Sequence, residues 1–302
     1  MLRTLIAVAF LLALPSLVMA ADAPPKADEA QTEAAFMKGL TKRTGAVNLP
    51  KANAVLNLGE RYYFLDPADS KKVIEQAWGN PKGSADNVLG MVFLAGTTPF
   101  DEPGWGAVVT YLPTGYVPDN DARTTDYDKI LKQLREGEDE DNKERKKEGG
   151  REIHLAGWAQ PPSYEPQAHT LIWARDLEFT GVQEHGLNYD VRVLGRKGVL
   201  SLNVVAGLNQ LPQIRTAAEA LRSVAVFDQG SRYADYQQGT DKRAAFGIGG
   251  LVLGGAGLLV AQKAGLFAVA LLFLKKGLVV ILAAGAGAWA WLRRKLGGKK
   301  AV

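Results

Sequence analysis

The chain has 302 residues, no cysteine and a formal net charge of +4. The absence of cysteine excludes disulfides, so an exported domain would depend on packing for its stability. All 32 acidic residues but only 27 of the 36 basic residues fall within residues 21–243, so the basic excess belongs to the two ends of the chain. This distribution argues against nucleic-acid binding, which would need the excess on the folded part.

The first 20 residues have the pattern of a secretory signal peptide. Arg3 precedes an apolar run over residues 5–14, and the small residues Val18 and Ala20 precede a plausible cleavage site before Ala21. An uncleaved N-terminal anchor is the alternative interpretation. Both interpretations export residues 21–243, which we expect to form the main domain.

The exported part starts with a polar stretch and then alternates between helix and strand patterns. Pro67 suits the first turn of a helix, and Gly79 lies past its end. Runs of β-branched and aromatic residues indicate strands, and the glycines of residues 195–198 indicate a hairpin turn. Helices are expected over residues 28–45, 67–79, 125–134 and 211–223, and strands over 46–50, 54–59, 61–66, 88–96, 104–112, 151–159, 168–180, 187–194, 199–208 and 224–227.

This order of elements predicts an α+β fold, with a largely antiparallel sheet and interspersed helices, followed by C-terminal transmembrane helices. Thr125 is expected to cap the third helix. The charged run over residues 135–152 is typical of a solvated helix end or a mobile loop. Residues 228–243 have the composition of a tether that leads into the membrane.

Four motifs are similar to those of a known family. They are GYVPDNDA (115–122), GWAQPPSYEPQAHTLIWA (157–174), LNYDVRVLGRKGVLSLNVVA (187–206) and GSRYADYQQGTDKRAAFG (230–247). Together they resemble the DUF2167 family of bacterial proteins over most of residues 40–265. The resemblance implies an exported, membrane-anchored protein of unknown function, and it brings no catalytic or binding residues with it.

The three histidines, His154, His169 and His185, are too widely spaced for a typical zinc site, so we expect no metal and no cofactor. His169 follows Tyr164 and Glu165 in a proline-rich loop. One hypothesis makes it a general base that works with Glu165 or Asp190. The alternative is that His169 only hydrogen-bonds the loop onto the sheet.

A second polar group lies on the strand over residues 187–194. Alternation places Asn188, Asp190 and Arg192 on one strand face. They could form a groove in which Arg192 or Arg196 binds a carboxylate or phosphate, because a guanidinium suits both groups. A structural ion-pair network is the alternative.

The aromatic residues Trp158, Trp173 and Tyr189 could form a surface on which a glycan stacks, although aromatics in alternating strands often belong to the core. The aspartates around residues 119–128 fail the spacing of an EF-hand loop, so helix capping explains them better. The candidate ligand-binding residues are Arg192, Arg196, Trp158, Tyr164 and Asn188.

The C-terminal tract resembles a membrane anchor. Residues 244–262 contain no charge, residues 277–292 form a second apolar segment, and a basic tail follows over 293–302. About 18 uncharged residues suffice to cross a bilayer as a helix. We expect an anchor over residues 244–292 that crosses once or twice, and a two-helix hairpin is favoured because both segments are apolar enough to insert. The objection is that the positive-inside tendency favours a cytoplasmic tail, which a hairpin would not give.

The signal and anchor patterns predict an exported, membrane-anchored protein. Combined with the bacterial origin that the resemblance implies, they place it in the inner membrane with its main domain in the periplasm. Its expected role is that of a non-enzymatic scaffold or sensor that acts through contacts with an envelope protein. The alternatives are an envelope hydrolase or transferase, and a module that binds glycans or lipid head groups. The sequence predicts no oligomeric state.

Overall fold

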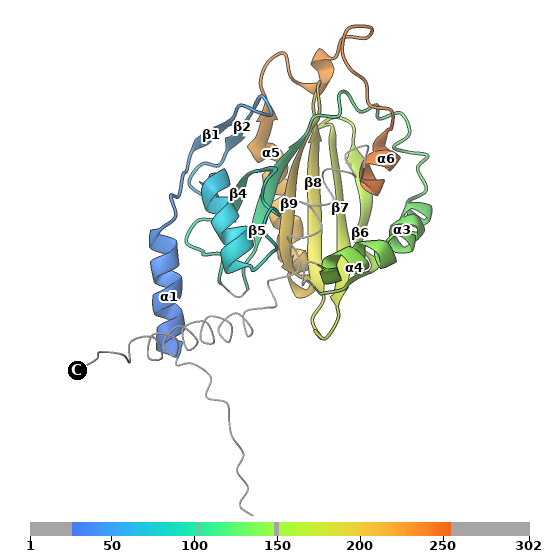
Figure 1. The fold of residues 1–302 in the computed structure, drawn as a ribbon. Helices are drawn as coiled ribbons and strands as arrows, with labels where there is room; N and C mark the ends of the chain where they lie inside the picture. Colours follow the sequence, from blue (N-terminus) through green and yellow to red (C-terminus); the bar gives the residue numbers. More distant parts are fainter. Residues whose placement is uncertain (1–25, 102, 148–150, 255–302) are drawn as a thin grey trace, which may run out of the picture.

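The computed structural model describes residues 26–101, 103–147 and 151–254 (Figure 1). The predicted signal peptide, the basic tail and the predicted anchor beyond residue 254 lie outside these described residues. The described part of the chain contains no helix that is both long enough and apolar enough to cross a membrane.

A seven-stranded sheet forms the centre of the fold, and every neighbouring pair in it is antiparallel. A smaller antiparallel sheet lies beside it. The prediction of an α+β fold with an antiparallel sheet is therefore confirmed. The large sheet has the order β3 (Tyr62–Leu65), β4 (Val88–Leu94), β5 (Gly106–Leu112), β9 (Val199–Gly207), β8 (Gly186–Leu194), β7 (Thr170–Phe179), β6 (Ile153–Glu165), and the small one β1 (Ala46–Leu49), β2 (Ala54–Asn57), β10 (Ala225–Phe227).

One face of the large sheet packs against α5 (Leu211–Val224) and the small sheet, and Figure 1 shows α5 behind the strands. The buried residues of α5 recur at helical spacing and form one apolar stripe. On β8, Leu187, Val191 and Val193 point into this core, as the alternation predicts. The buried positions of α5 are Ile214, Ala217, Ala218, Leu221 and Val224.

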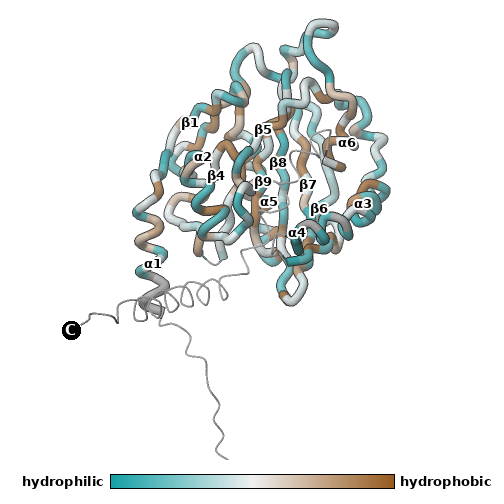
Figure 2. Tube along the Cα trace, in the orientation of Figure 1, coloured by the Kyte–Doolittle hydropathy of each residue, from teal (hydrophilic) through white to brown (hydrophobic). Residues whose placement is uncertain are grey.

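The opposite face, here called the front face, carries helices at its two sides. On one side lie α1 (Lys26–Lys38) and α2 (Pro67–Lys71), which continues as the π-helical η1 (Lys72–Ala77). On the other side α3 (Tyr127–Glu136) and α4 (Glu138–Lys147) contact β6, and α3 contacts α6 (Ile248–Leu253). In Figure 2 the tube of α6 is brown, and thus hydrophobic, whereas much of α3 is teal.

Two local expectations on the front face need correction. The cap of α3 is Asp126, whose carboxylate accepts the Lys129 amide at 3.0 Å, because Thr125 instead donates its hydroxyl to the Asp121 carbonyl. Residues 138–147 of the charged run form α4, which packs one side against β6 while its other side is exposed. Asn142 is buried there and bonds both the amide and the carbonyl of Ile153 at 2.9 Å.

Residues 228–253, here called the connector, are docked onto the domain and do not form a loose tether. The guanidinium of Arg196 donates to both carboxylate oxygens of Asp241, at 2.7 and 2.9 Å. The Ala244 amide donates to the Tyr116 carbonyl at 2.8 Å. At the end of the connector, Ile248, Leu251 and Val252 of α6 are buried in a core cluster with residues of α3 and β7.

Two glycines make room for this docking. Gly115 has a positive φ of 90°, and a Cβ there would lie 2.5 Å from the Lys242 carbonyl oxygen. A Cβ at Gly247 would collide with the Asp121 carboxylate. That carboxylate accepts the amides of Ile248 and Gly249, at 2.8 and 3.0 Å, and so caps α6.

Candidate functional site

Five polar side chains meet on the front face of strands β7, β8 and β9. The period of two along a strand brings Asn188 and Asp190 onto this face with Arg192, and the antiparallel register adds Arg175 of β7 and Asn203 of β9. We call Arg175, Asn188, Asp190, Arg192 and Asn203 the arginine cluster. It lies between the apolar regions that α2 and η1 cover on one side and α6 on the other.

The members of the arginine cluster are joined in one network. Arg175 Nη2 donates to Asp190 at 3.2 Å and to the Asn188 side-chain oxygen at 3.0 Å. Arg192 Nη2 donates to the other oxygen of Asp190 at 3.4 Å. The Asn203 amide donates to the same Asn188 oxygen. Asp190 therefore lies between two guanidinium groups, with the two asparagines at one end.

Several buried atoms of this network have no hydrogen-bond partner among the described residues. These are four donors and one acceptor: Arg192 Nε and Nη1, Arg175 Nε, Asn188 Nδ2 and Asn203 Oδ1. Buried polar groups are nearly always paired, and each unpaired one costs about 1–3 kcal/mol. So many unmet groups within one cluster indicate a missing polar partner.

The electrostatics of the arginine cluster point the same way. Burial lowers the pKa of Arg192, against the opposite effect of Asp190, and Arg175 lowers it further. Because a guanidinium stays protonated in proteins, two cations face one carboxylate. The Arg192 guanidinium also lies 4.7 Å from the centre of the Trp173 ring, a favourable cation–π position. The cluster can therefore attract an anion, and its one carboxylate, Asp190, is engaged by both guanidinium groups.

A second group, formed by Tyr164, His169 and Asp119, lies at the β6–β7 turn. The Tyr164 hydroxyl donates to Asp119 at 2.7 Å, and its oxygen lies 3.3 Å from Nδ1 of His169. Since the tyrosine proton goes to Asp119, its oxygen accepts from His169 Nδ1–H, which leaves Nε2 as a proton acceptor. Burial, and then the bond to Asp119, raises the pKa of Tyr164, so its hydroxyl stays protonated.

His169 is also part of an aromatic column. Its ring stacks on Tyr233 with centroids 4.2 Å apart, Tyr233 stacks on Tyr116 at 4.5 Å, and Tyr116 stacks on Tyr236 at 3.8 Å. Burial lowers the pKa of His169, and the Asp119 charge opposes this shift. The imidazole thus contacts both the proline-rich loop, through Tyr164, and the connector, through Tyr233.

Three of the sequence-predicted residues, Glu165, Arg196 and Trp158, lie apart from these two groups. Glu165 accepts from Arg222 of α5 at 2.7 Å, and Asp190 belongs to the arginine cluster, so neither is the bonded partner of His169. Arg196 is held by Asp241 in the connector. The Trp158 indole donates to the Tyr127 carbonyl at 3.3 Å.

The aromatic surface suggested for glycans does not form. Trp173 and Tyr189 are 1% and 2% exposed, and they are buried in different core clusters on opposite faces of the sheet. Trp158 is partly buried against the cluster that contains Trp173. The alternation of side chains between the two sheet faces explains this separation, because the register pairs Trp173 with Asp190 rather than with Tyr189.

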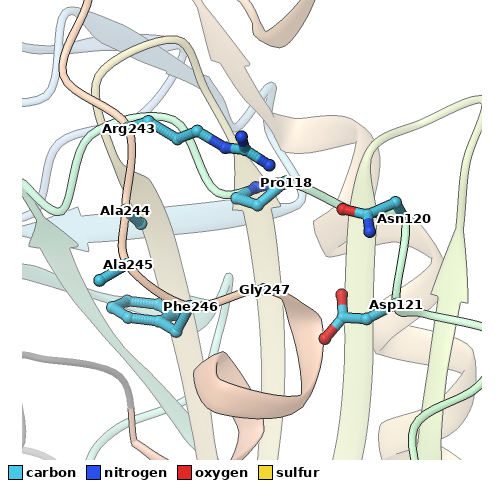
Figure 3. Close-up of a pocket in the computed structure, with 8 residues that line it drawn as sticks. All are labelled: Pro118, Asn120, Asp121, Arg243, Ala244, Ala245, Phe246 and Gly247. Atoms are coloured by element: carbon cyan, nitrogen blue, oxygen red, sulfur yellow. The ribbon is translucent and has the colours of Figure 1, made fainter.

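A cavity of about 500 Å³ opens between the loop over residues 118–121 and the connector (Figure 3). The figure shows Arg243 extending towards Pro118, and Asp121 pointing towards the start of α6 at Gly247. None of the sequence-predicted site residues lines the cavity. Within the described ranges, no three histidine or carboxylate side chains gather closely enough to hold a metal.

The family described as "Protein of unknown function (DUF2167)" matches residues 41–286. The chain belongs to the DUF2167 family. No curated protein matches the sequence. Among solved structures, the solution structure of cyanobacterial PsbP (CyanoP) from Synechocystis sp. PCC 6803 is similar, with a TM-score of 0.34 and 8% identity over 63% of this chain and 92% of that chain. That level of similarity says nothing of function.

The sequence patterns did not predict three residues that complete the arginine cluster and the group around Tyr164 and His169. Arg175, Asn203 and Asp119 are 13 to 45 residues away from the side chains they contact. Only the strand register places the first two beside Asn188. One signal was available, because polar residues at alternate positions of three apolar strands are unusual on a buried face.

Proposed function

We propose that this DUF2167 protein is a non-enzymatic sensor or scaffold, anchored in the bacterial inner membrane with residues 21–243 in the periplasm. The docked connector is the observation that supports this role most. Because Asp241, Ala244 and α6 are fixed to the domain, a movement of the domain would pass directly into the chain that follows residue 254. A loose tether would not transmit it.

The docking of α6 also changes the proposed anchor. The first predicted span began at residue 244, yet α6 packs in the domain core. The apolar sequence over residues 255–274 still has 20 residues with Lys263 as its one charge. At about 1.5 Å per residue, a helix of that length spans roughly 30 Å, which matches the hydrocarbon core. A single crossing there would keep the basic tail in the cytoplasm.

The lack of native cysteine makes this arrangement testable by labelling. Gln167, on the exposed β6–β7 turn, and Val302, in the tail, would each be changed to cysteine in the full-length protein. We expect a membrane-impermeant maleimide to label the variant at 167 in spheroplasts and the variant at 302 only after lysis. Labelling of both without lysis would favour a two-helix hairpin, and labelling of neither would contradict export of the domain.

The sensor role is tested by releasing the connector. Asp241→Asn removes the charge that holds Arg196, whereas Asp228→Asn makes the same chemical change at an exposed connector residue. Full-length variants would be cross-linked in cells, and their partners identified by mass spectrometry. We expect Asp241→Asn to lose or change the partners while the domain stays folded, with Asp228→Asn unchanged. Identical partners for all three proteins would contradict coupling through the connector.

A further inference from the structure

We propose that the arginine cluster binds the carboxylate of a small hydroxy acid. This inference rests on the sensor role only for its biological purpose, since binding at the cluster requires neither a membrane nor a partner. It is drawn from the five buried atoms of the cluster that have no hydrogen-bond partner among the described residues. The competing explanation is a purely structural ion-pair network filled by water.

Charge gives the first argument. Arg175 and Arg192 carry two positive charges against the single negative charge of Asp190, so the cluster has an excess of +1. Asp190 is 2% exposed at its side chain, and Asn188 is fully buried. An uncompensated charge in such surroundings is strongly destabilising. A monovalent anion balances it, whereas a doubly charged phosphate would reverse it.

The nearest further charges do not remove this excess. Arg145 of α4 is close enough to Arg175 for the two like charges to affect each other. Burial lowers the pKa of Arg145, and the opposing effects of Asp141 and Glu138 show that those acids serve Arg145. No other carboxylate joins the hydrogen-bonded network among the described residues.

The donors and the acceptor give the second argument. The four unpaired donors are Arg192 Nε, Arg192 Nη1, Arg175 Nε and Asn188 Nδ2. A carboxylate has two oxygens with about four lone-pair sites, so it can accept from several such donors. The unpaired Asn203 Oδ1 requires a donor, and a hydroxyl beside the carboxylate could supply it. Acetate can therefore only accept hydrogen bonds, whereas glycolate can both accept and donate them.

Burial gives the third argument. The side chains of Arg175 and Arg192 are each 14% exposed, while the asparagines and Asp190 lie deeper. The unpaired atoms themselves are closed off from solvent, so a ligand reaches them only when the arginine side chains move aside. Only a small head group fits this description, because Trp173 and the apolar clusters surround the site.

The test measures binding of acetate, glycolate and inorganic phosphate to the full-length protein in detergent, by calorimetry and by the shift in melting temperature. Ionic strength is kept constant with sodium chloride. We expect glycolate to bind more tightly than acetate, and phosphate to bind weakly or not at all. Tighter binding of phosphate would overturn the carboxylate assignment, and no binding of any anion would show a water-filled structural network.

The variants separate binding from folding. Arg192→Gln and Arg175→Gln remove donors and charge from the cluster, while Arg215→Gln changes an arginine of α5 that bonds Gln160 on the other side of the sheet. We expect glycolate affinity to fall roughly tenfold or more in the two cluster variants and to stay constant in the control. If either cluster variant fails to fold, Arg192→Lys keeps the charge with fewer donors and should weaken binding to a smaller extent.

The melting temperature gives an independent readout. Without added carboxylate, Arg192→Gln removes an uncompensated buried charge, so we expect its melting temperature to equal or exceed that of the wild type. A structural network predicts the opposite, a lower melting temperature with or without glycolate. Because neither measurement involves the membrane, this inference can fail while the labelling and cross-linking experiments still support the sensor role.

Discussion

At the scale of single residues, His169 shows how a local cost is balanced by tertiary contacts. Its φ of 47° is a left-handed conformation that favours glycine, so a histidine there is strained. The ring offsets this through its bond to Tyr164 and its stacking on Tyr233. The backbone conformation alone would favour glycine at this position. The contacts of the ring with Tyr164 and Tyr233 therefore explain why a histidine is present.

The protonation of His169 should weaken the fold at acid pH. Because burial lowers the pKa of His169 below its ordinary value of 6.5, the unfolded chain takes up the proton at a higher pH than the folded protein. The stability that depends on the neutral ring is therefore complete above about pH 6.5 and is lost as the pH falls towards the folded pKa. The negative charge of Asp119 raises the pKa of His169, which reduces this loss of stability but does not cancel it.

We expect the wild type to lose more stability between neutral and mildly acid pH than the variant His169→Asn. Asparagine tolerates the left-handed conformation but does not titrate. Urea unfolding at both pH values would measure the difference. Equal losses in the two proteins would mean that the acid sensitivity comes from other groups.

At the scale of elements, the sequence predicts those whose signals are local. The hairpin turn after β8 and the apolar stripe of α5 depend on neighbouring residues, and both form as expected. The interpretation of residues 228–243 as a loose tether is wrong, because the residues that this stretch contacts, Tyr116 and Arg196, are distant in sequence. Composition alone could not show whether this stretch is docked onto the domain or forms a loose tether.

The stripe of α5 should carry a large share of the stability of the domain. Leu221 is fully buried between the helix and the sheet. Leu221→Ala should lower the free energy of unfolding by about 2–5 kcal/mol, the usual range for a buried leucine. Denaturant unfolding of the full-length protein would measure this, and a change below about 0.5 kcal/mol would contradict the placement of α5 in the core.

The cap of α6 offers a more selective change. Gly247→Ala should displace the Asp121 carboxylate, which would cost about 0.5–2 kcal/mol through the lost cap. Faster hydrogen exchange should be confined to the connector. Gly137→Ala is a matched control, since its added Cβ would meet nothing closer than 3.6 Å. The same exchange in both variants would show that the cap does not hold α6.

At the scale of the whole molecule, two features share one sheet. The front face of β7–β9 carries the arginine cluster, and the same β7 and β8 strands lead through Trp173 and Leu194 into the core where α6 is buried. A ligand at the arginine cluster and the chain that leaves the domain are thus supported by the same strands. We expect any coupling between the proposed ligand site and the connector to be carried by these shared strands.

The position of the connector is the central claim, and hydrogen exchange of the full-length protein in lipid nanodiscs tests it most directly. The amides of Ala244, Ile248 and Gly249 are bonded to Tyr116 and Asp121. We predict that these amides exchange about as slowly as those of β8, because they open only when the domain opens. Exchange at the rate of an unstructured chain, with β8 still protected, would show that the connector is a free tether and would contradict the coupling proposed between domain and membrane.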